Sequence, residues 1–531
     1  MRDHLLVNAN VLTMDSARPS AEAVLVAGER IVFVGGNAEA RALARPGARQ
    51  TDLGGQTLLP GFNEAHNHMI AFGLSLAQVE AGYPAVRSIA AMMVGFAARA
   101  RETSAGAWVR GRGYDDNKLD ERRHPSRHDL DAAVPDHPAI VTNASGHMSV
   151  VNSRAIRLAG IGPDTPDPQG GRIVRDEHGE PTGLLQETAQ GLVQAIMPEP
   201  TPVELHEAVR RCCRAYAAAG ITSSQDASSS AAAEIAAYQE ARATGDLLPR
   251  TTLMIRDNLL PHLAGLGLRG GFGDERLRIG PIKFFADGSL IGRTAAVTQP
   301  FLADPRRDNL GLEMMPQEEL DERVWQAHRA GFQLATHAIG DRAIGVVLDA
   351  YERALARLPR ADHRHRIEHC GILRPDLIER LRVGAFIAVS QPIFISEYGD
   401  GFRRHLGEAR LQLTYPFRSL LDAGVPLVFS SDCPVSAFQP LKGIRDAVQE
   451  RTGSGASYAL EEALTVEEAL HAYTVAGAYA SFDEGRKGQL RPGLLADLTV
   501  LAADPRHADP ATIAEIPVTM TIVGGAVVHG G

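Results

Sequence analysis

The stretch Leu58-Leu-Pro-Gly-Phe-Asn-Glu-Ala-His-Asn-His68 joins an apolar run to two histidines that lie one residue apart at its end. In an extended strand, side chains two residues apart point to the same face. His66 and His68 can therefore direct their imidazoles toward one point in space. An apolar strand that ends in this way is typical of half of a metal site. The other ligands must then come from elsewhere in the chain.

The composition is that of a globular protein with an acidic balance. Apolar residues make up 44% of the 531 positions and charged residues 22%, which is ordinary for a soluble protein. The net charge of −10 and the pI near 6.0 argue against a nucleic-acid partner, which would require a basic surface. The length predicts one large barrel-type domain or two domains.

The cysteines and the apolar runs indicate the compartment. The 4 cysteines form no CxxC pair, which favours free thiols in a reducing compartment. Polar residues interrupt the first ten positions before a signal-like apolar core can build, and no run approaches the roughly 18 apolar residues of a membrane span. We therefore expect a cytoplasmic protein that does not insert into a membrane.

Both ends of the chain are rich in strand-forming residues, whereas the middle is not. Ala23-Val-Leu-Val-Ala27 near the start has the same texture as Val518-Thr-Met-Thr-Ile-Val523 near the end. The simplest arrangement pairs residues 1–57 with residues 484–531 in one small β domain. Two separate end modules are the alternative, although each would have little core of its own.

Residues 58–483 alternate short apolar strands with helical patterns, which predicts an α/β fold of the (β/α)₈ TIM-barrel type. Together with the opening stretch, the predicted strands begin at Ala139, Gly220, Ile279, Phe332, His365, Ala385 and Val425.

A turn-rich segment near residues 160–186 interrupts this alternation. Gly162-Pro-Asp-Thr-Pro-Asp-Pro168 is followed by an apparent hairpin over residues 172–183. A loop of this length inside a barrel is more often functional than not. We interpret the segment as an insertion at the active-site rim, with a solvated excursion as the alternative.

Polar side chains follow the apolar runs of several predicted barrel strands. Because active sites of such barrels lie at the carboxyl ends of the strands, we expect these side chains to converge. Four imidazoles and one carboxylate suit a divalent ion, with zinc first and manganese or iron as alternatives. The candidate set is His66, His68, Lys283, His337, His369 and Asp432.

Lys283 is the unusual member of this set, because an ammonium group repels a cation. It can serve as a ligand only when neutral or covalently altered, for example when CO₂ converts its amine to a carbamate that bridges two metals. The alternative is a core lysine that pairs with Asp287.

The same motifs, in this order, resemble the amidohydrolase superfamily, and in particular its branch (amidohydrolase family 3) that includes N-substituted formamide deformylases. The resemblance extends nearly from end to end. It is carried by Pro60-Gly-Phe before the two histidines and by Ile282-Lys-Phe-Phe-Ala-Asp-Gly-Ser-Leu290, Thr336-His-Ala-Ile-Gly-Asp-Arg-Ala343, Arg366-Ile-Glu-His369 and Ser431-Asp-Cys-Pro-Val435.

The resemblance implies a barrel with a β-sandwich and a centre of one or two metals. His66, His68 and Asp432 would hold one ion, and His337 and His369 the other, with a carboxylated Lys283 between them. A metal-activated hydroxide would attack the carbonyl carbon, and Asp432 would act as general base and then as general acid.

Three positions depart from the pattern of the family. Glu64 stands where an aspartate is usual, and we expect it to orient the His66 ring from the same strand face. Cys433, the residue after Asp432, and Tyr114 each stand where a tryptophan is usual, and we expect both near the substrate side.

Four further residues are weaker candidates for the site. His147 could contact the substrate carbonyl or a developing oxyanion, or have a structural role. Asp287 and Asp341 would orient ligands or cap helices. Arg293 could recognise an anionic group of the substrate or form a surface ion pair.

These features predict a hydrolase that acts on C–N bonds other than peptide bonds, with a small-molecule amide or formamide as substrate. A deaminase or cyclic-amide hydrolase on the same fold is one alternative, although Gly340 occupies the place of the glutamate that deaminases carry. A metal-free binding or regulatory protein is the other. A homodimer is the default assembly.

Overall fold

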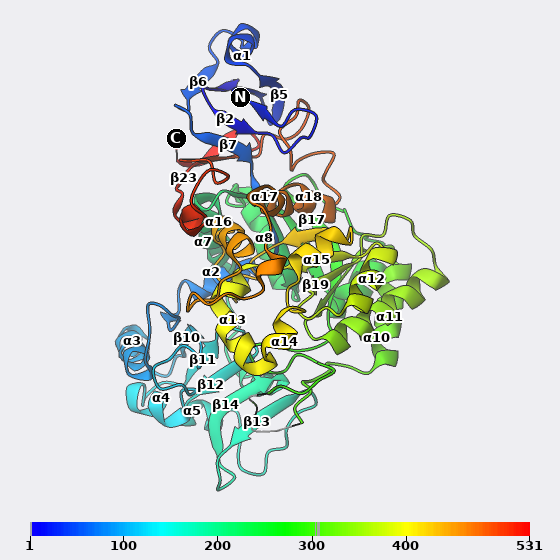
Figure 1. The fold of residues 1–531 in the computed structure, drawn as a ribbon. Helices are drawn as coiled ribbons and strands as arrows, with labels where there is room; N and C mark the ends of the chain where they lie inside the picture. The colour runs from blue at the N-terminus through cyan, green and yellow to red at the C-terminus, as the bar shows by residue number, and fades with distance from the viewer. Residues whose placement is uncertain (1–2, 303, 305–307, 531) are drawn as a thin grey trace.

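The computed structural model describes residues 3–302, 304 and 308–530. The chain builds three regions: a central barrel, a β-sandwich at one end, and a further sheet at the opposite end (Figure 1). In the described part of the chain, no helix combines the length and apolar character needed to cross a membrane.

Eight parallel strands form the barrel, in the order in which they occur in the sequence. Strand β21 returns to β8, where the Asp432 N–H donates to the His66 carbonyl (2.8 Å) and the His68 N–H to that of Cys433 (2.7 Å). These bonds nearly close the barrel at its carboxyl end. The strands are β8 (Phe62–Asn67), β15 (Ile221–Ser229), β16 (Arg250–Arg256), β17 (Leu277–Phe285), β18 (Leu334–Ala338), β19 (Arg366–His369), β20 (Ile387–Ser390) and β21 (Leu427–Phe429).

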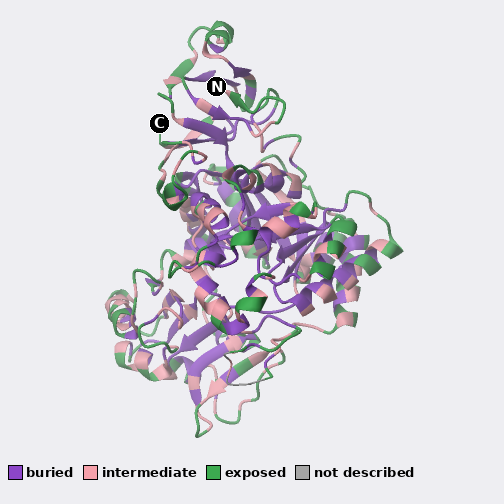
Figure 2. Cartoon of the chain, viewed as in Figure 1, coloured by how far each residue is buried: buried purple, intermediate pink, exposed green. Residues whose placement is uncertain are grey.

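Helices cover the barrel, and their exposed residues lie on the sides that face away from it (Figure 2). In α7, Thr201 and Glu204 form a capping box at the start, and Leu205, Val209 and Tyr216 are buried at helical spacing. The barrel-covering helices include α2 (Met69–Ser75), α7 (Pro202–Ala218), α8 (Ala232–Thr244), α9 (Leu260–Gly265), α10 (Gln317–Arg329), α11 (Asp341–Arg357), α12 (Pro375–Val383), α13 (Ile393–Leu406), α16 (Pro440–Gln449), α17 (Val466–Tyr473) and α18 (Val475–Ala480).

Both ends of the chain contribute to the β-sandwich. Val26 and Leu58 from the first residues share one core with Leu498 and Ile522 from the last. One sheet contains β5 (Arg30–Gly35), β4 (Ala23–Ala27), β1 (His4–Val7) and β6 (Arg49–Asp52). The other contains β24 (Ala526–Gly530), β23 (Val518–Val523), β22 (Leu498–Leu501), β7 (Thr57–Pro60), β2 (Asn10–Leu12) and β3 (Ser20–Ala21).

Gly61 separates β7 of the sandwich from β8 of the barrel. A Cβ atom at this position would lie 2.1 Å from the side chain of Thr222, so the two regions approach one another too closely for any other residue. The barrel therefore begins a few residues after position 58.

The third region is larger than the predicted insertion at residues 160–186. The expected hairpin exists, since β13 (Gly171–Arg175) pairs with β14 (Pro181–Glu187). It is only the edge of a six-stranded sheet that continues through β12 (Met148–Val151), β11 (Ala139–Asn143), β10 (Val109–Tyr114) and β9 (Val79–Glu80). Helices α3 (Ile89–Glu102), α4 (Arg127–Ala133) and α5 (Ser153–Leu158) belong to this region, which we call the cap sheet.

One predicted barrel strand was therefore wrong and one was missed. The strand at Ala139 lies in the cap sheet, where β11 pairs with β10 and β12. The third barrel strand is β16, which the sequence analysis did not identify. Both segments are short apolar runs with polar ends, and the local pattern of such a run does not specify which sheet it joins.

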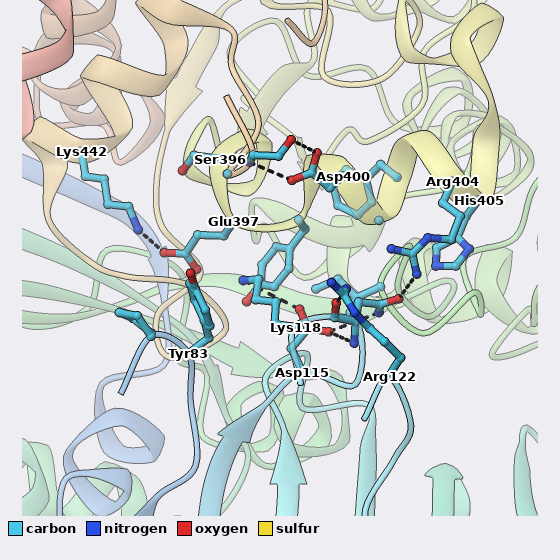
Figure 3. A pocket seen from close by; sticks show the side chains of 18 of the residues that line it. Tyr83, Asp115, Lys118, Arg122, Ser396, Glu397, Asp400, Arg404, His405 and Lys442 are labelled. Carbon is cyan, nitrogen blue, oxygen red and sulfur yellow. Dashed lines mark hydrogen bonds and ion pairs between the residues drawn. The ribbon is translucent and has the colours of Figure 1, made fainter. Parts of the chain in front are cut away.

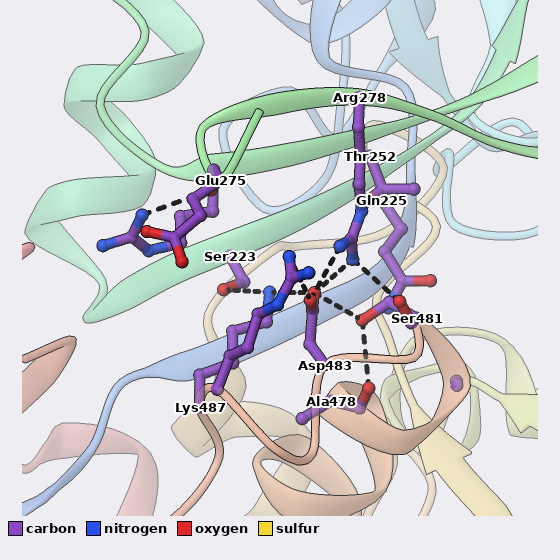
Figure 4. A network of polar contacts seen from close by, with 12 residues as sticks. Ser223, Gln225, Thr252, Glu275, Arg278, Ala478, Ser481, Asp483 and Lys487 are labelled. Carbon is purple, nitrogen blue, oxygen red and sulfur yellow. Dashed lines mark hydrogen bonds and ion pairs between the residues drawn. The ribbon is translucent and has the colours of Figure 1, made fainter. Parts of the chain in front are cut away.

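An ion-pair network ties the amino end of the barrel to the segment that leads back to the sandwich (Figure 4). The Arg278 guanidinium at the start of β17 pairs with the Asp483 carboxylate. Lys487 Nζ lies 3.2 Å from the same carboxylate and donates to Ser223 Oγ at 2.8 Å. Every charged group of this buried network has an opposite charge beside it.

Candidate metal centre

The carboxyl ends of β8 and β21 bring His66, His68 and Asp432 together. One ligand atom from each residue lies within 4.8 Å of the others. Asp432 Oδ1 is 3.3 Å from His66 Nε2 and 3.1 Å from His68 Nε2. Three nitrogen and oxygen ligands at this spacing are a common protein contribution to a divalent metal site.

His337 and His369 extend this cluster across the neighbouring strand ends. The His369 ring centroid is 4.8 Å from that of His66 and 4.5 Å from that of His337. Five of the six residues of the candidate set thus form one continuous cluster of side chains at the carboxyl end of the barrel.

The sixth residue, Lys283, is fully buried, and its Nζ atom has no hydrogen-bond partner among the described residues. The alternative pairing with Asp287 is therefore absent. Burial lowers the pKa of Lys283 to about 8. This shift favours the neutral amine, which is the form that reacts with CO₂.

Hydrogen bonds fix the orientation of three of the imidazoles. In each ring one nitrogen is engaged by a neighbour, which leaves the other nitrogen for a ligand. The partners are Glu368 for Nδ1 of His66, Gln391 Oε1 for Nδ1 of His369 at 2.8 Å, and the Gly288 carbonyl for Nε2 of His337 at 3.0 Å.

Glu368 keeps its negative charge inside the barrel. Burial alone would raise the pKa of this carboxyl group, but the Arg366 guanidinium and the His66 ring outweigh that effect and hold the pKa well below its usual range. Arg366 Nη2 donates to Glu368 Oε2 at 2.9 Å and to the Ala65 carbonyl at 2.7 Å. The ring of His66 is thus held by an ionised carboxylate.

Glu368 and Gln391 were not predicted as orienting residues, although the sequence carries a signal for each. Glu368 precedes a predicted ligand within Arg366-Ile-Glu-His369, and Gln391 is the polar residue that ends the seventh predicted strand. The expectation that Glu64 orients the His66 ring was wrong, because Glu368 occupies that place.

Glu64 instead joins the first and last barrel strands. Its Oε1 atom accepts the N–H groups of Ser431 (2.9 Å) and His66 (3.3 Å). Its Oε2 atom is buried without a hydrogen-bond partner among the described residues, and burial raises the pKa of Glu64 to about 8. Since Ser431 precedes Asp432, Glu64 positions that ligand through the backbone.

His147 reaches the centre from the cap sheet and not from a barrel loop. Its ring centroid is 5.7 Å from that of His337. Nδ1 lies 2.7 Å from Glu187 Oε2, at the end of β14, and Nε2 has no hydrogen bond to a described residue. The pair was not predicted, because Glu187 is 40 positions away in a segment without a motif.

Asp287 is placed to support the metal centre, whereas Asp341 is not. Asp287 accepts the N–H groups of Ala296 (2.9 Å), Ile339 (3.0 Å) and Gly340 (2.8 Å) and lies 3.5 Å from His337 Nε2. Burial raises the pKa of Asp287 to about 7. Asp341, in the first turn of α11, binds Thr298 and Arg374.

Tyr114 and Arg293 lie away from the ligands. Tyr114 is buried in the core of the cap sheet, and its hydroxyl group lies 3.1 Å from His124 Nδ1. The expectation that it lines the substrate side was wrong, since its side chain fills the hydrophobic core. Arg293 Nε lies 3.3 Å from Asp304 Oδ2, which corresponds to the ion-pair alternative.

Strained backbone marks the same region. The φ angles of His369, Asp432 and Glu187 are +75°, +59° and +49°. Residues other than glycine adopt this left-handed conformation at a cost of about 1–3 kcal/mol each, and such residues cluster at functional sites.

The donor set fits a divalent metal ion. The imidazole nitrogens and the Asp432 carboxylate are ordinary ligands for zinc or a neighbouring first-row ion. Two buried polar atoms, Lys283 Nζ and Glu64 Oε2, have no partner among the described residues. A buried polar group without a partner is costly, so a bound group that meets it removes this cost.

Comparisons with known proteins agree with this arrangement. An N-substituted formamide deformylase of Arthrobacter pascens is 33% identical over 99% of this chain and 98% of its own length. A putative amidohydrolase of Bacillus subtilis (strain 168) is 31% identical over 91% of each chain. The crystal structure of an uncharacterised metal-dependent hydrolase from Pyrococcus horikoshii OT3 superimposes with a TM-score of 0.78 at 26% identity, covering 96% of this chain and 99% of that one.

The assignment of this chain to a family rests on a match over most of its sequence. Residues 49–529 match the Amidohydrolase family, a span that includes the whole barrel and nearly all of the C-terminal contribution to the sandwich. Hydrolytic chemistry and a dependence on divalent metal agree with the ligand cluster and with the structural neighbour. The chain belongs to the amidohydrolase family.

Proposed function

We propose that the protein hydrolyses the C–N bond of a small amide or formamide in a metal-dependent reaction. The observation that carries this proposal is the convergence of His66, His68 and Asp432 within 4.8 Å at the carboxyl end of the barrel. The name of the Arthrobacter relative, which specifies formamide deformylation, supports the substrate class.

A divalent ion held by these residues would supply Lewis acidity and would make water a stronger acid near neutral pH. Asp432 is the proposed general base and acid. Burial alone would raise the pKa of its carboxyl group, but hydrogen bonds from His66 and His68 outweigh that effect and hold the pKa well below its usual value. An ionised Asp432 accepts the proton of the attacking water and delivers it to the leaving nitrogen.

His147 is the proposed electrophilic group on the carbonyl side. Glu187 accepts from Nδ1 and fixes the ring. Burial alone would lower the pKa of His147, but the Glu187 carboxylate outweighs that effect and raises it, which favours the protonated ring. In that form Nε2 can donate a hydrogen bond to the carbonyl oxygen as negative charge develops there. The strained backbone of Glu187 agrees with a position selected for this contact.

Lys283 supports a centre with two ions. As a carbamate, its buried side chain would bridge the ligand group around His66 and the one formed by His337 and His369. Zinc is the first choice for both ions. A cytoplasmic location and a homodimer remain predictions.

A ring deaminase is less compatible with the local structure. A Cβ atom at Gly340 would lie 1.9 Å from the Ala296 carbonyl oxygen. The position that carries a glutamate in deaminases therefore has no room for a side chain here.

The test is a substrate panel with metal-loaded protein: N-benzylformamide and N-benzylacetamide as open amides, a cyclic imide and an aromatic ester. We expect the highest kcat/KM for the formamide, and a loss of activity after treatment with a chelator that added zinc reverses. Activity confined to the ester or the ring compound would contradict the proposal.

A further inference from the structure

Two adjoining cavities lie between α13, the cap sheet and the loop that follows Asp432. The inner cavity has a volume of about 370 Å³ and is lined by Cys433, the residue after Asp432, together with Arg112 and Phe438. The outer cavity, of about 550 Å³, lies between α13 and the loop after β10 (Figure 3). Tyr83, Asp115, Lys118, Glu397 and Tyr398 line both.

Three of the cations that line the outer cavity already have a polar partner nearby. Lys442 pairs with Glu397. Arg404 donates to Asn117 Oδ1 at 2.7 Å, and Lys118 lies 3.7 Å from Asp115 Oδ2. Lys442 and Lys118 thus face carboxylates, and the Arg404 guanidinium is hydrogen-bonded.

Arg112, near the end of β10, is different. Its guanidinium makes no hydrogen bond and no ion pair with any described residue, and its Nε atom is fully buried without a partner. Arg293 and Arg342 also have Nε atoms without a hydrogen bond, but each faces a carboxylate, Asp304 at 3.3 Å and Glu313 at 3.0 Å.

No described carboxylate is paired with Arg112, and those nearest to it in the sheet and the cavity have other partners. Glu80, its neighbour on β9, accepts the Gly82 N–H at 2.6 Å. Glu397 is paired with Lys442, and Asp115 accepts the Asn117 N–H at 2.9 Å. Arginine stays protonated even when buried, so the inner cavity contains one unmatched positive charge beside the residue that follows Asp432.

We propose that Arg112 binds an anionic group of the substrate, a carboxylate in the first instance, in the inner cavity. This inference rests on the proposed function, since it specifies which amides are hydrolysed: those whose amine portion carries a carboxylate, such as N-formyl or N-acyl amino acids. A guanidinium presents two parallel N–H donors that match the two oxygens of a carboxylate.

The experiment compares N-formylphenylalanine with its uncharged amide, N-formylphenylalanine amide, in metal-loaded protein. We expect a preference for the carboxylate compound. In Arg112→Met, the ratio of kcat/KM between the charged and uncharged compounds falls roughly 10- to 100-fold, the loss expected for a hydrogen bond to a charged group. Arg112→Lys retains part of the preference.

Arg110→Met is the matched control. Arg110 lies two residues earlier on β10 and donates to the Pro198 carbonyl at 3.0 Å, outside both cavities. Its substitution leaves the ratio at the wild-type value. A ratio that is the same in wild type and Arg112→Met would overturn the inference.

A binding measurement separates this inference from the proposed function. If neither formyl compound is hydrolysed, the proposed substrate class fails, and calorimetric titration with 3-phenylpropionate and 3-phenylpropionamide tests Arg112 alone. The inference predicts that Arg112→Met weakens binding of the carboxylate roughly tenfold or more relative to the amide. Equal binding of the carboxylate by wild type and by Arg112→Met would refute it.

Discussion

The two ends of the barrel each bury a lysine but surround it differently. At the amino end, Lys487 Nζ contacts Ser223 Oγ and the Asp483 carboxylate, and Arg278 completes the network. At the carboxyl end, Lys283 Nζ is fully buried and has no hydrogen bond or ion pair with a described residue, although it lies 4.9 Å from the centroid of the Phe285 ring. One buried lysine of the barrel region thus has hydrogen-bond and ion-pair partners, and the other has neither among the described residues.

The different surroundings of Lys487 and Lys283 indicate that the first lysine serves stability and the second serves function. Removing one partner of a buried ion pair leaves an uncompensated charge and destabilises the fold by about 3–5 kcal/mol. A buried donor that has no hydrogen-bond partner already costs about 1–3 kcal/mol in the native protein. That cost persists where a ligand or a chemical modification meets the group in the working protein. We therefore expect substitutions at the carboxyl end to change activity and those at the amino end to change stability.

The largest effect should come from Asp432→Asn. The amide cannot accept the proton of water, so kcat/KM should fall roughly 10²- to 10⁴-fold while the unfolding midpoint stays close to that of wild type. Steady-state kinetics together with metal analysis measure this. Asp349→Asn, at a half-buried position of α11 where the carboxylate pairs with Arg380, is the control with the same change of atoms. A comparable loss in that variant would count against a specific role for Asp432.

Lys283→Met should remove activity without weakening the metal-free fold. We expect a loss in kcat/KM of at least roughly 10- to 100-fold, the range found for residues that only hold a ligand in place. The metal content should also fall. In chelator-treated protein no hydrogen bond is broken by the substitution, so the urea midpoint should not decrease. A marked decrease would show that Lys283 is a structural residue.

Lys487→Met is the matched test at the amino end. It leaves Asp483 with one cation fewer and Ser223 Oγ without its donor, so the free energy of unfolding should drop by about 3 kcal/mol. Urea unfolding measures this, and kcat/KM should keep its wild-type value. A loss of activity without a loss of stability would reverse the assignment of the two ends.

The pH dependence of the free energy of unfolding should reveal how much the ionised Asp483 carboxylate stabilises the fold. Burial alone would raise its pKa, but Lys487 and Arg278 outweigh that effect and lower it from 3.8 to about 2. A carboxyl group with a depressed folded-state pKa contributes stability above its unfolded pKa and loses it as the pH falls toward the folded value.

The stability difference between wild type and Asp483→Asn should therefore shrink by about 2 kcal/mol between pH 4 and pH 2. Urea unfolding at several pH values in this window measures it. If the difference stays constant across the window, the ion pair does not stabilise the fold in the way described.

The sequence predicts the barrel well because its strands are apolar runs that alternate with helical patterns. Its failures have one physical cause, which is that local pattern does not specify a strand's neighbours. The run at Ala139 has the residue types of a barrel strand and lies in the cap sheet, whereas Arg250–Arg256 is a barrel strand framed by arginines.

The candidate ligands could be predicted from the sequence, because the alternation of side chains along a strand and the position of a strand end are local features. The residues that form hydrogen bonds to these ligands were harder to predict. Glu368 orients His66 from a distance of 302 positions, and Glu187 orients His147 from 40 positions away, at the end of the strand that pairs with β12. Such contacts depend on the register between strands, which no single motif contains.

The central claim is that the carboxyl end of this barrel holds divalent metal through His66, His68 and Asp432. The most direct measurement is the metal content of protein purified without chelator, for wild type and for the double variant His66→Ala/His68→Ala. We predict about one to two divalent ions per folded wild-type chain, as in other centres of this ligand type, and at least one fewer in the double variant. Hydrolysis by a wild-type protein that contains no divalent ion, or equal metal content in the two proteins, would contradict the claim.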